Sequence, residues 1–302
     1  MMSLFASLPR PLWGLLLSGL GMLIISPDGM LLHMIRQAGL WETLFWRCLG
    51  IGVTLFVVLL ALYRQRLWGM IAGLGRVGLL SVLTLTASNL LFVDAMVHTS
   101  VANTLVFMAS MPLWSAICGL LFIREAVQPR TWGAIALGLG GIGVIVSDSL
   151  RLGGDSLHGD MAALGAALAF GLNLVVLRKA GNRDMTASLM LSEGMTALIA
   201  LPFVSTWSLP THDMMLLGFQ GFVYLPLALT LFMAGARYAP AAEVALLSLI
   251  ETVLGPLWAW LVLSEAPSVR ALLGGALIIA AVAGNTLLGM VQARRPVLLV
   301  KD

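Results

Sequence analysis

Two glutamates interrupt long apolar stretches of the chain. Glu251 lies eleven residues after Pro240, and Glu193 lies nine residues after Asp184; the rise of an α-helix converts these spacings to depths of about 16 Å and about 13 Å. A charged side chain at the centre of a membrane helix costs about 2.5–3.5 kcal/mol. Either carboxyl group could therefore exchange a proton or pair with a cationic ligand. A structural glutamate bonded to a neighbouring carbonyl group is the alternative for both.

Asp28 and Arg47 form a second candidate site. Asp28 lies eighteen residues after Arg10, about 27 Å along a helix, and Arg47 lies about one turn inside the outer end of the next apolar segment. The sequence Ser26-Pro27-Asp28-Gly29 predicts a local break, because proline removes a backbone hydrogen bond and clashes with the preceding turn. The opened backbone could hold a ligand carboxylate or close an outer gate. A structural salt bridge that neutralises Arg47 is the other interpretation.

Two asparagines also lie in the middle of apolar segments. Asn89 and Asn173 could donate and accept hydrogen bonds with a polar ligand. Hydrogen bonds between packed helices explain them more simply.

The composition requires a membrane environment for the elements that hold these residues. Of 302 residues, 60% are apolar and 10% are charged, whereas a soluble domain carries about 25% charged residues. The 17 basic residues are scattered, so the net charge of +3 does not indicate a nucleic-acid partner. Cys48 and Cys118 each lie in an apolar segment and are expected to be small core residues.

Ten apolar segments are long enough to cross a membrane, since about 20 residues span its hydrocarbon core. Their continuous apolar runs predict helices, because the strands of a membrane barrel would alternate apolar and polar residues. The fold class is therefore an all-α integral membrane protein. The expected spans are residues 12–33, 42–63, 74–96, 100–123, 132–148, 160–178, 186–207, 214–236, 241–263 and 270–291.

The distribution of Lys and Arg predicts the orientation. With a cytoplasmic N-terminus, thirteen basic residues fall on the inner side and three on the outer side, which is the bias expected for membrane proteins. We therefore expect a multi-pass protein of a bacterial inner (plasma) membrane with both termini in the cytoplasm. The three outer residues are Arg36, Arg151 and Arg270.

The two halves of the chain repeat each other. Glu125 and Glu265 lie 140 residues apart, and each ends an apolar segment and precedes a proline. The predicted repeats are residues 1–150 and residues 151–302. Because each holds five helices, an odd number, the halves must have opposite orientations in the membrane, as in many secondary transporters.

The same offset pairs Asn103 with Glu243. Inverted symmetry then predicts that one lies near the outer face and the other near the inner face. Such positions would suit the entry and exit gates of a pathway.

The chain resembles the drug/metabolite transporter superfamily and, within it, the EamA-type ten-helix transporters. The resemblance rests on the duplicated plan, on the block from Ala95 to Glu125 and its repeat from Gly235 to Glu265, and on Arg47. It implies an inner-membrane carrier, often an exporter of amino acids or related metabolites, that works by alternating access around a central cavity.

Two details of the resemblance concern particular helices. The fourth helix is central in this family, which implies that Phe107 and Met111 line the cavity. The sequence departs from the family where Glu251-Thr252 replaces a common Glu-Pro and a proline follows at Pro256, which predicts a displaced kink in the ninth helix.

The leading interpretation is a secondary transporter of a small metabolite, with export by alternating access and proton coupling as an option. An exporter of organic cations or drugs is the alternative. A non-transporting receptor would leave the buried acids unexplained. An intramembrane enzyme is disfavoured because the sequence contains no HExxH, GxSxG or nucleotide-binding motif.

The expected partners are a small-molecule substrate and membrane lipid, without nucleic acid or cofactor, and the protein is expected to be a monomer or a homodimer. No metal site is expected, because the histidines fall at or beyond outer helix ends and would have to converge across loops. Asp94, near the outer end of the third segment, is expected to be hydrated. The histidines are His33, His98, His158 and His212.

Overall fold

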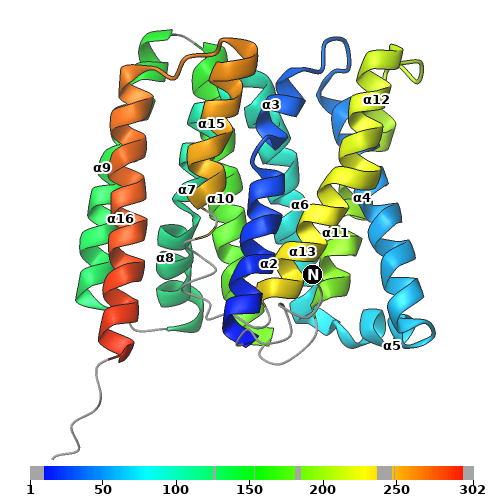
Figure 1. The fold of residues 1–302 in the computed structure, drawn as a ribbon, viewed down its shortest axis with the longest axis horizontal. Helices are drawn as coiled ribbons and strands as arrows, with labels where there is room; N and C mark the ends of the chain where they lie inside the picture. Colours follow the sequence, from blue (N-terminus) through cyan, green and yellow to red (C-terminus); the bar gives the residue numbers. More distant parts are fainter. Residues whose placement is uncertain are drawn as a thin grey trace, which may run out of the picture.

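The computed structural model describes residues 10–124, 127–152, 154–180, 185–236, 247 and 249–294. Within these ranges every regular element is a helix, and the long helices run side by side along one direction (Figure 1). Nine of the described helical spans are long and apolar enough to cross a membrane, and a shorter tenth one covers Ile250–Leu263. The predicted all-α membrane fold is therefore confirmed.

The first half of the chain forms five membrane spans and one short helix at the lower end of Figure 1. Its elements are α2 (Arg10–Ile25), α3 (Asp28–His33), α4 (Leu40–Tyr63), α5 (Arg66–Gly73), α6 (Gly75–His98), α7 (Val101–Ala109), α8 (Met111–Ile123) and α9 (Pro129–Leu152).

The second half forms the other five spans. Its elements are α10 (Gly154–Ala180), α11 (Thr186–Ala200), the 3₁₀ turn η1 (Leu201–Phe203), α12 (Thr211–Phe219), the π-helical turn η2 (Gln220–Tyr224), α13 (Leu225–Ala236), α15 (Leu249–Leu263) and α16 (Val269–Arg294).

Prolines divide two of the predicted spans. The first span is interrupted at Ser26 and Pro27, as predicted, so that α2 ends and α3 begins within it. The fourth span, predicted as one helix, is interrupted at Ser110, two residues before Pro112, because proline clashes with the preceding turn. In contrast, Pro256 lies inside the continuous helix α15.

Several predicted boundaries were wrong by more than three residues. The sixth helix begins at Gly154, before residue 160, and the seventh span ends at Phe203, before residue 207. The predicted start of the ninth span at residue 241 lies outside the described residues. Helix α5 was not predicted, because its eight residues are too short for the length criterion used to find spans.

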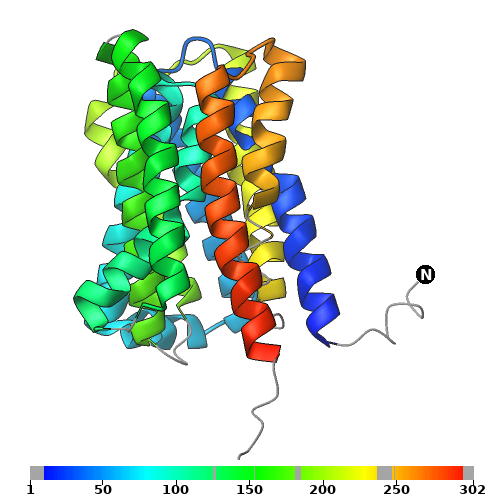
Figure 2. The ribbon, with the colours of Figure 1, turned by 90° about the vertical axis from the view of Figure 1, so that its left-hand side faces the viewer.

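The packing pattern has the symmetry of an inverted repeat. The first helix of each half packs against the third span of the other half, α2 against α13 and α10 against α6. Three further pairs join equivalent spans of the two halves: α4 with α11, α7 with α15, and α9 with α16. Helix α2 begins and α16 ends at the same, lower end of the bundle (Figure 2), as an even number of crossings requires.

Large apolar side chains on the perimeter of the bundle are not covered by protein. Leu62, Leu198 and Leu121 are each about two-thirds exposed. In water such a surface would be an aggregation hazard, whereas lipid tails cover it at no cost. The lipid environment expected from composition therefore follows from the structure as well.

Glycines allow α9 and α16 to approach closely. A Cβ atom added to Gly141 would lie 2.6 Å from the carbonyl oxygen of Gly274, too close for any real side chain. A Cβ atom added to the neighbouring Gly140 would meet nothing within 4 Å. Small residues at such crossings are the usual means by which membrane helices pack.

These two adjacent glycines provide a matched test of the packing. Gly141→Ala should force α9 and α16 apart and destabilise the protein by about 1–3 kcal/mol, the usual cost of overpacking. Gly140→Ala should leave stability unchanged or slightly higher. The measurement is the thermal unfolding of both purified variants in detergent, and equal melting temperatures would contradict the predicted contact.

Candidate functional site

A buried ion pair lies at the centre of the site. Nη2 of Arg47 donates a hydrogen bond of 2.6 Å to Oδ2 of Asp28, and the two side chains are only 8% and 4% exposed. Asp28 is in the first turn of α3, directly after the break at Pro27. The break thus brings the carboxylate to face α4, and the predicted Asp28–Arg47 pair is confirmed.

Glu193 adds a second carboxyl group beside the guanidinium. Its side chain, on α11, is buried and lies within range of the Arg47 charge. Nδ2 of Asn89, on α6, donates to Oε1 of Glu193 at 2.9 Å, and the buried Cys48 thiol of α4 lies close to the same carboxyl group. On the other side the guanidinium lies 5.9 Å from the ring centre of Phe92, a distance typical of a cation–π contact.

A π-helical turn brings a tyrosine to this group. Tyr224, the last residue of η2, is buried and lies within electrostatic range of Asp28 and Arg47. Close packing of Gly221 against the backbone of α4 at Gly50 allows this approach. Single π turns inside α-helices are frequent at functional sites.

Glu251 is the third carboxyl group near Arg47. It lies on α15, twelve residues before the upper end of this helix, a distance of about 18 Å, and within electrostatic range of Asp28 and Arg47. The same helix is tied to the break in the first span, because Nε1 of Trp258 donates to Oγ of Ser26 at 3.0 Å.

Some polar atoms of this group are not paired within the described part of the chain. Oδ1 of Asp28, Nε of Arg47 and the Tyr224 hydroxyl are buried and have no hydrogen-bond partner among the described residues. Buried polar atoms normally have partners, and a native exception calls for an explanation such as a water molecule or a ligand. We name Asp28, Arg47, Glu193, Tyr224 and Glu251 the central cluster.

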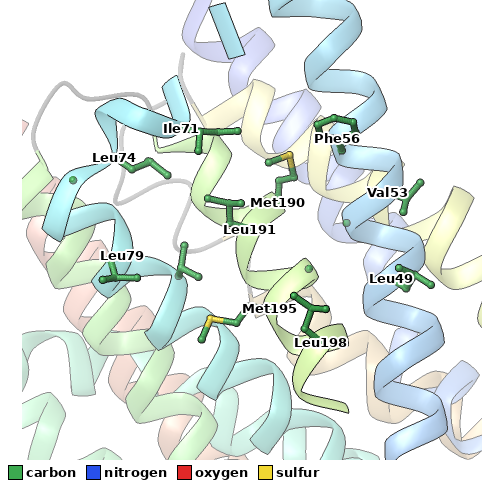
Figure 3. Close-up of a pocket in the computed structure, with 14 residues that line it drawn as sticks. Leu49, Val53, Phe56, Ile71, Leu74, Leu79, Met190, Leu191, Met195 and Leu198 are labelled. Atoms are coloured by element: carbon green, nitrogen blue, oxygen red, sulfur yellow. The ribbon is translucent and has the colours of Figure 1, made fainter. Parts of the chain in front are cut away.

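An apolar cavity of about 600 Å³ lies beside the central cluster, between α4, α6 and α11 (Figure 3). Gly194, the residue after Glu193, lines it, together with aliphatic and methionine side chains. Figure 3 shows Met190 and Met195 of α11 beside the cavity. A hydrophobic part of a molecule would fit here. Arg47 and Glu193 lie two residues and one residue before the lining residues Leu49 and Gly194.

Comparison with known proteins decides what kind of protein carries this site. The EamA-like transporter family matches the chain twice, over residues 12–147 and 157–287. The chain belongs to the EamA-like transporter family. The resemblance expected from the sequence is thus confirmed, and an EamA-like protein is a membrane transporter of small solutes. The division at residues 150 and 151 stays a prediction.

A solved structure shares the fold of this chain over nearly its whole length. A solved structure described as "Crystal structure of protein" is 16% identical and superposes with a TM-score of 0.63, covering 93% of this chain and 98% of that chain. At this identity the likeness concerns the fold alone. No curated protein matches the sequence.

Other predicted residues lie away from the central cluster of this EamA-like protein. Oδ1 of Asn173 accepts hydrogen bonds from Ser81 at 2.7 Å and Thr84 at 3.3 Å, which join α10 to α6. These contacts support the packing interpretation of Asn173. In contrast, Asn89 belongs to the site through Glu193.

The fourth span contributes less to the site than the resemblance implied. Phe107 is fully buried in a hydrophobic core formed with α9, α10 and α16. Met111 begins α8 below the break, and its backbone packs close to Gly171 of α10. Neither residue has a described contact with the central cluster.

Asn103 lies near the upper end of the bundle, as expected, but its partner was not predicted. Nδ2 of Asn103 and Oγ1 of Thr99 donate to Oδ1 of Asp160 at 3.1 Å and 2.8 Å. Asp160 is fully buried and links α10 to the start of α7. The symmetric Glu243 lies outside the described residues.

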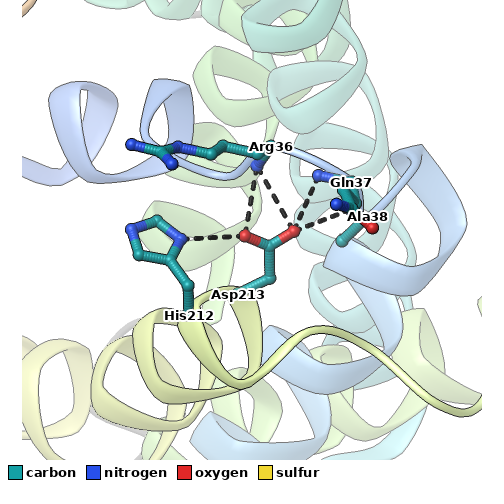
Figure 4. A network of polar contacts seen from close by, with 5 residues as sticks. All are labelled: Arg36, Gln37, Ala38, His212 and Asp213. Atoms are coloured by element: carbon teal, nitrogen blue, oxygen red, sulfur yellow. Dashed lines mark hydrogen bonds and ion pairs between the residues drawn. The ribbon is translucent and has the colours of Figure 1, made fainter.

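Carboxylates also hold the connections at this end. Asp213, in the first turn of α12, accepts hydrogen bonds from the backbone N–H groups of Arg36, Gln37 and Ala38 at 2.7–3.3 Å and contacts His212 (Figure 4). Its side chain is 1% exposed. The connection between α3 and α4 is therefore fixed to α12.

Two glutamates also accept backbone hydrogen bonds at this end of the bundle. Oε1 of Glu42 accepts hydrogen bonds from the backbone N–H groups of Ser205 and Thr206, at 2.8 Å and 3.2 Å. Oε1 of Glu265 accepts one from the backbone N–H of Val101 at 3.1 Å. The upper ends of α4, α7, α12 and α15 are thus joined through side chains, above the central cluster.

Tyr224, Asp160 and Cys48 were not predicted from the sequence to lie beside these polar groups. Tyr224 could have been found from the sequence, because a tyrosine in the middle of an apolar span needs a hydrogen-bond partner for its hydroxyl group. Cys48 did not, because its role depends on Glu193 of a distant helix. The π turn that orients Tyr224 has no sequence signature that we recognise.

Substitutions at the ion pair should reveal its coupling. Arg47→Ala or Asp28→Ala alone leaves one buried charge without its partner and should cost about 3–5 kcal/mol of stability. The double variant removes both charges and should recover part of that loss. Thermal unfolding of the four proteins measures the coupling, and strictly additive shifts would show that the two groups do not interact.

Proposed function

We propose that this EamA-like protein exports a small metabolite with an amino group, an amino acid or a related compound, by alternating access. The supporting observation is the charge balance of the central cluster. One carboxyl group pairs with the guanidinium and two more lie within electrostatic range of it, so full ionisation would leave an excess of two negative charges in an apolar bundle. Protons or a cationic group of the substrate must neutralise this excess, because isolated buried charges are strongly unfavourable.

The unused polar atoms suggest how such a substrate would bind. The substrate amino group would pair with Glu251 or Glu193, while its carboxylate would accept hydrogen bonds from Arg47 and the Tyr224 hydroxyl. In an amino acid, the amino group and the carboxylate lie a few ångströms apart. Arg47 would then exchange some of its contact with Asp28 for the substrate.

Proton coupling follows from the same balance. Glu251 would be protonated when the amino group is absent and ionised when it is bound, so that a proton and the substrate alternate. Export would require the carboxylate contacts at the upper ends of the helices to open and the opposite end to close. Chemical energy from ATP is not expected, because the sequence has no nucleotide-binding motif.

A second candidate substrate is a hydrophobic organic cation. The observation in its favour is the apolar cavity beside the central cluster, which would accept an aromatic or aliphatic body while the cationic group pairs with Glu193. Such a molecule has no carboxylate, so it would not need Arg47.

A binding screen tests the proposal and separates the two candidates. Amino acids, amines and lipophilic cations are added to the protein in detergent, and the ligand is the compound that raises the melting temperature, since binding to the folded state stabilises it. If the ligand is an amino acid, Glu251→Gln should weaken its binding at least about tenfold, which corresponds to a loss of about 1.4 kcal/mol of binding free energy. In proteoliposomes Glu251→Gln should lose acceleration by a pH gradient while retaining some substrate exchange.

Phe107→Leu, in the core away from the cluster, is the control and should bind the ligand with unchanged affinity. If no amine-containing compound stabilises the protein, the proposed substrate class is wrong. If Glu251→Gln transports at the wild-type rate with an unchanged pH profile, then Glu251 is structural.

We further propose that the protein lies in a bacterial inner membrane with both termini in the cytoplasm. The excess of basic residues at the lower end of the bundle supports this orientation. Reporter fusions after residue 302 and near Arg183 should be active in the cytoplasm, and a fusion near Asp155 in the periplasm. A periplasmic C-terminus would contradict this topology.

A further inference from the structure

Two histidines and an aspartate meet at the upper end of the bundle, away from the central cluster. Nε2 of His158 lies 2.9 Å from Oδ2 of Asp94. Nδ1 of His98 lies 3.1 Å from Oδ1 of the same carboxylate and 2.9 Å from the backbone carbonyl oxygen of Asp94. One ligand atom from each of the three side chains lies within 4.8 Å of the others. The expectation that the histidines would not converge was therefore wrong for this pair.

Close packing of two helices explains the convergence. Asp94 and His98 are one turn apart on α6, whereas His158 is near the start of α10. A Cβ atom added to Gly159 would lie 2.7 Å from the backbone nitrogen of Thr99. This glycine brings the backbones of α6 and α10 together and places the two imidazole rings 4.8 Å apart, edge to face.

The cluster is not required by the repeated scaffold. The residues 140 positions after Asp94 and His98 are Ala234 and Tyr238, so the sequence of the second repeat lacks these ligand types at the equivalent positions. The side chains of His98 and His158 are 33% and 59% exposed, whereas Asp94 is 17% exposed. An ion could therefore reach the site from the aqueous side.

We propose that Asp94, His98 and His158 bind a divalent transition-metal ion, with Zn²⁺ as the preferred ion. Imidazole nitrogen and carboxylate oxygen are ordinary zinc ligands at about 2.0–2.2 Å, and three protein ligands leave a fourth position for water. Two ligands at a tetrahedral angle lie about 3.3 Å apart at these bond lengths, close to the two nitrogen–oxygen distances in the cluster.

Such a site would have a mechanical consequence. Its ligands come from the first and the second half of the chain, and both helices end near the contacts between Asp160, Thr99 and Asn103. A bound ion would fasten α6 to α10 at the upper end of the bundle. Movements that separate these helices would become less favourable when the metal is present.

The alternative is a carboxylate shared by two imidazoles through hydrogen bonds, without an ion. The two arrangements differ in one measurable property, the uptake of metal. Calorimetric titration of ZnCl₂ into the detergent-purified protein distinguishes them, provided that the affinity tag contains no histidine and is the same in all variants.

The wild-type protein should bind one Zn²⁺ per chain and should melt at a higher temperature with Zn²⁺, because the ion binds the folded state. His158→Ala should weaken binding at least about tenfold, since even indirect partners of a metal site contribute this much. Because His158 is mostly exposed, this variant is expected to fold. Asp94→Asn should weaken binding to a similar degree.

His212→Ala is the matched control. His212 is also partly exposed and contacts an aspartate at 3.0 Å, but it forms a pair and not a group of three, so its loss should leave Zn²⁺ binding unchanged. Wild-type protein that takes up no more Zn²⁺ than His158→Ala, or equal losses in His158→Ala and His212→Ala, would overturn the proposal. The readout requires no transport and is independent of the proposed substrate.

Discussion

The need to neutralise Arg47 inside an apolar bundle organises the central part of this protein. A buried guanidinium without a partner is unstable, so its neighbours must supply negative charge and hydrogen-bond acceptors. Asp28 provides them directly, and the break at Pro27 brings that carboxylate into position. Glu193 and Glu251 then add more negative charge than one guanidinium can balance. This excess is the basis of the proposed pairing with a cationic group of the substrate.

The two halves of the chain share a packing pattern, but they do not share the candidate site residues. The packing pairs of α2, α6, α10 and α13 are those of two inverted halves. The residues proposed to act, however, are not repeated: Met111 occupies the position equivalent to Glu251 in the first half. Asp94 and His98 likewise are not repeated, since Ala234 and Tyr238 occupy the equivalent positions in the second half. The repeated helices form the bundle, and the candidate sites lie where the two repeats carry different residues.

Close approach of backbones determines where polar groups can meet. Gly221 allows the π turn to contact α4, which places Tyr224 beside the ion pair. Gly159 similarly places His158 beside His98. In a lipid environment, where apolar attraction between helices is weak, packing of small residues and hydrogen bonds across helices are the main specific interactions. Here the same contacts that hold the bundle together also assemble its candidate sites.

Sequence alone determined the properties that depend on counting apolar residues along the chain. The membrane class, the ten spans, the inverted repeat and the pairing of Asp28 with Arg47 follow from segment length, from the 140-residue offset and from the cost of an unpaired charge. Only the tertiary structure decided which side chains from distant helices share one space. Asn89 joined the site and Phe107 did not, and His158 met Asp94, because lateral packing and helix rotation depend on contacts between segments that sequence spacing does not encode.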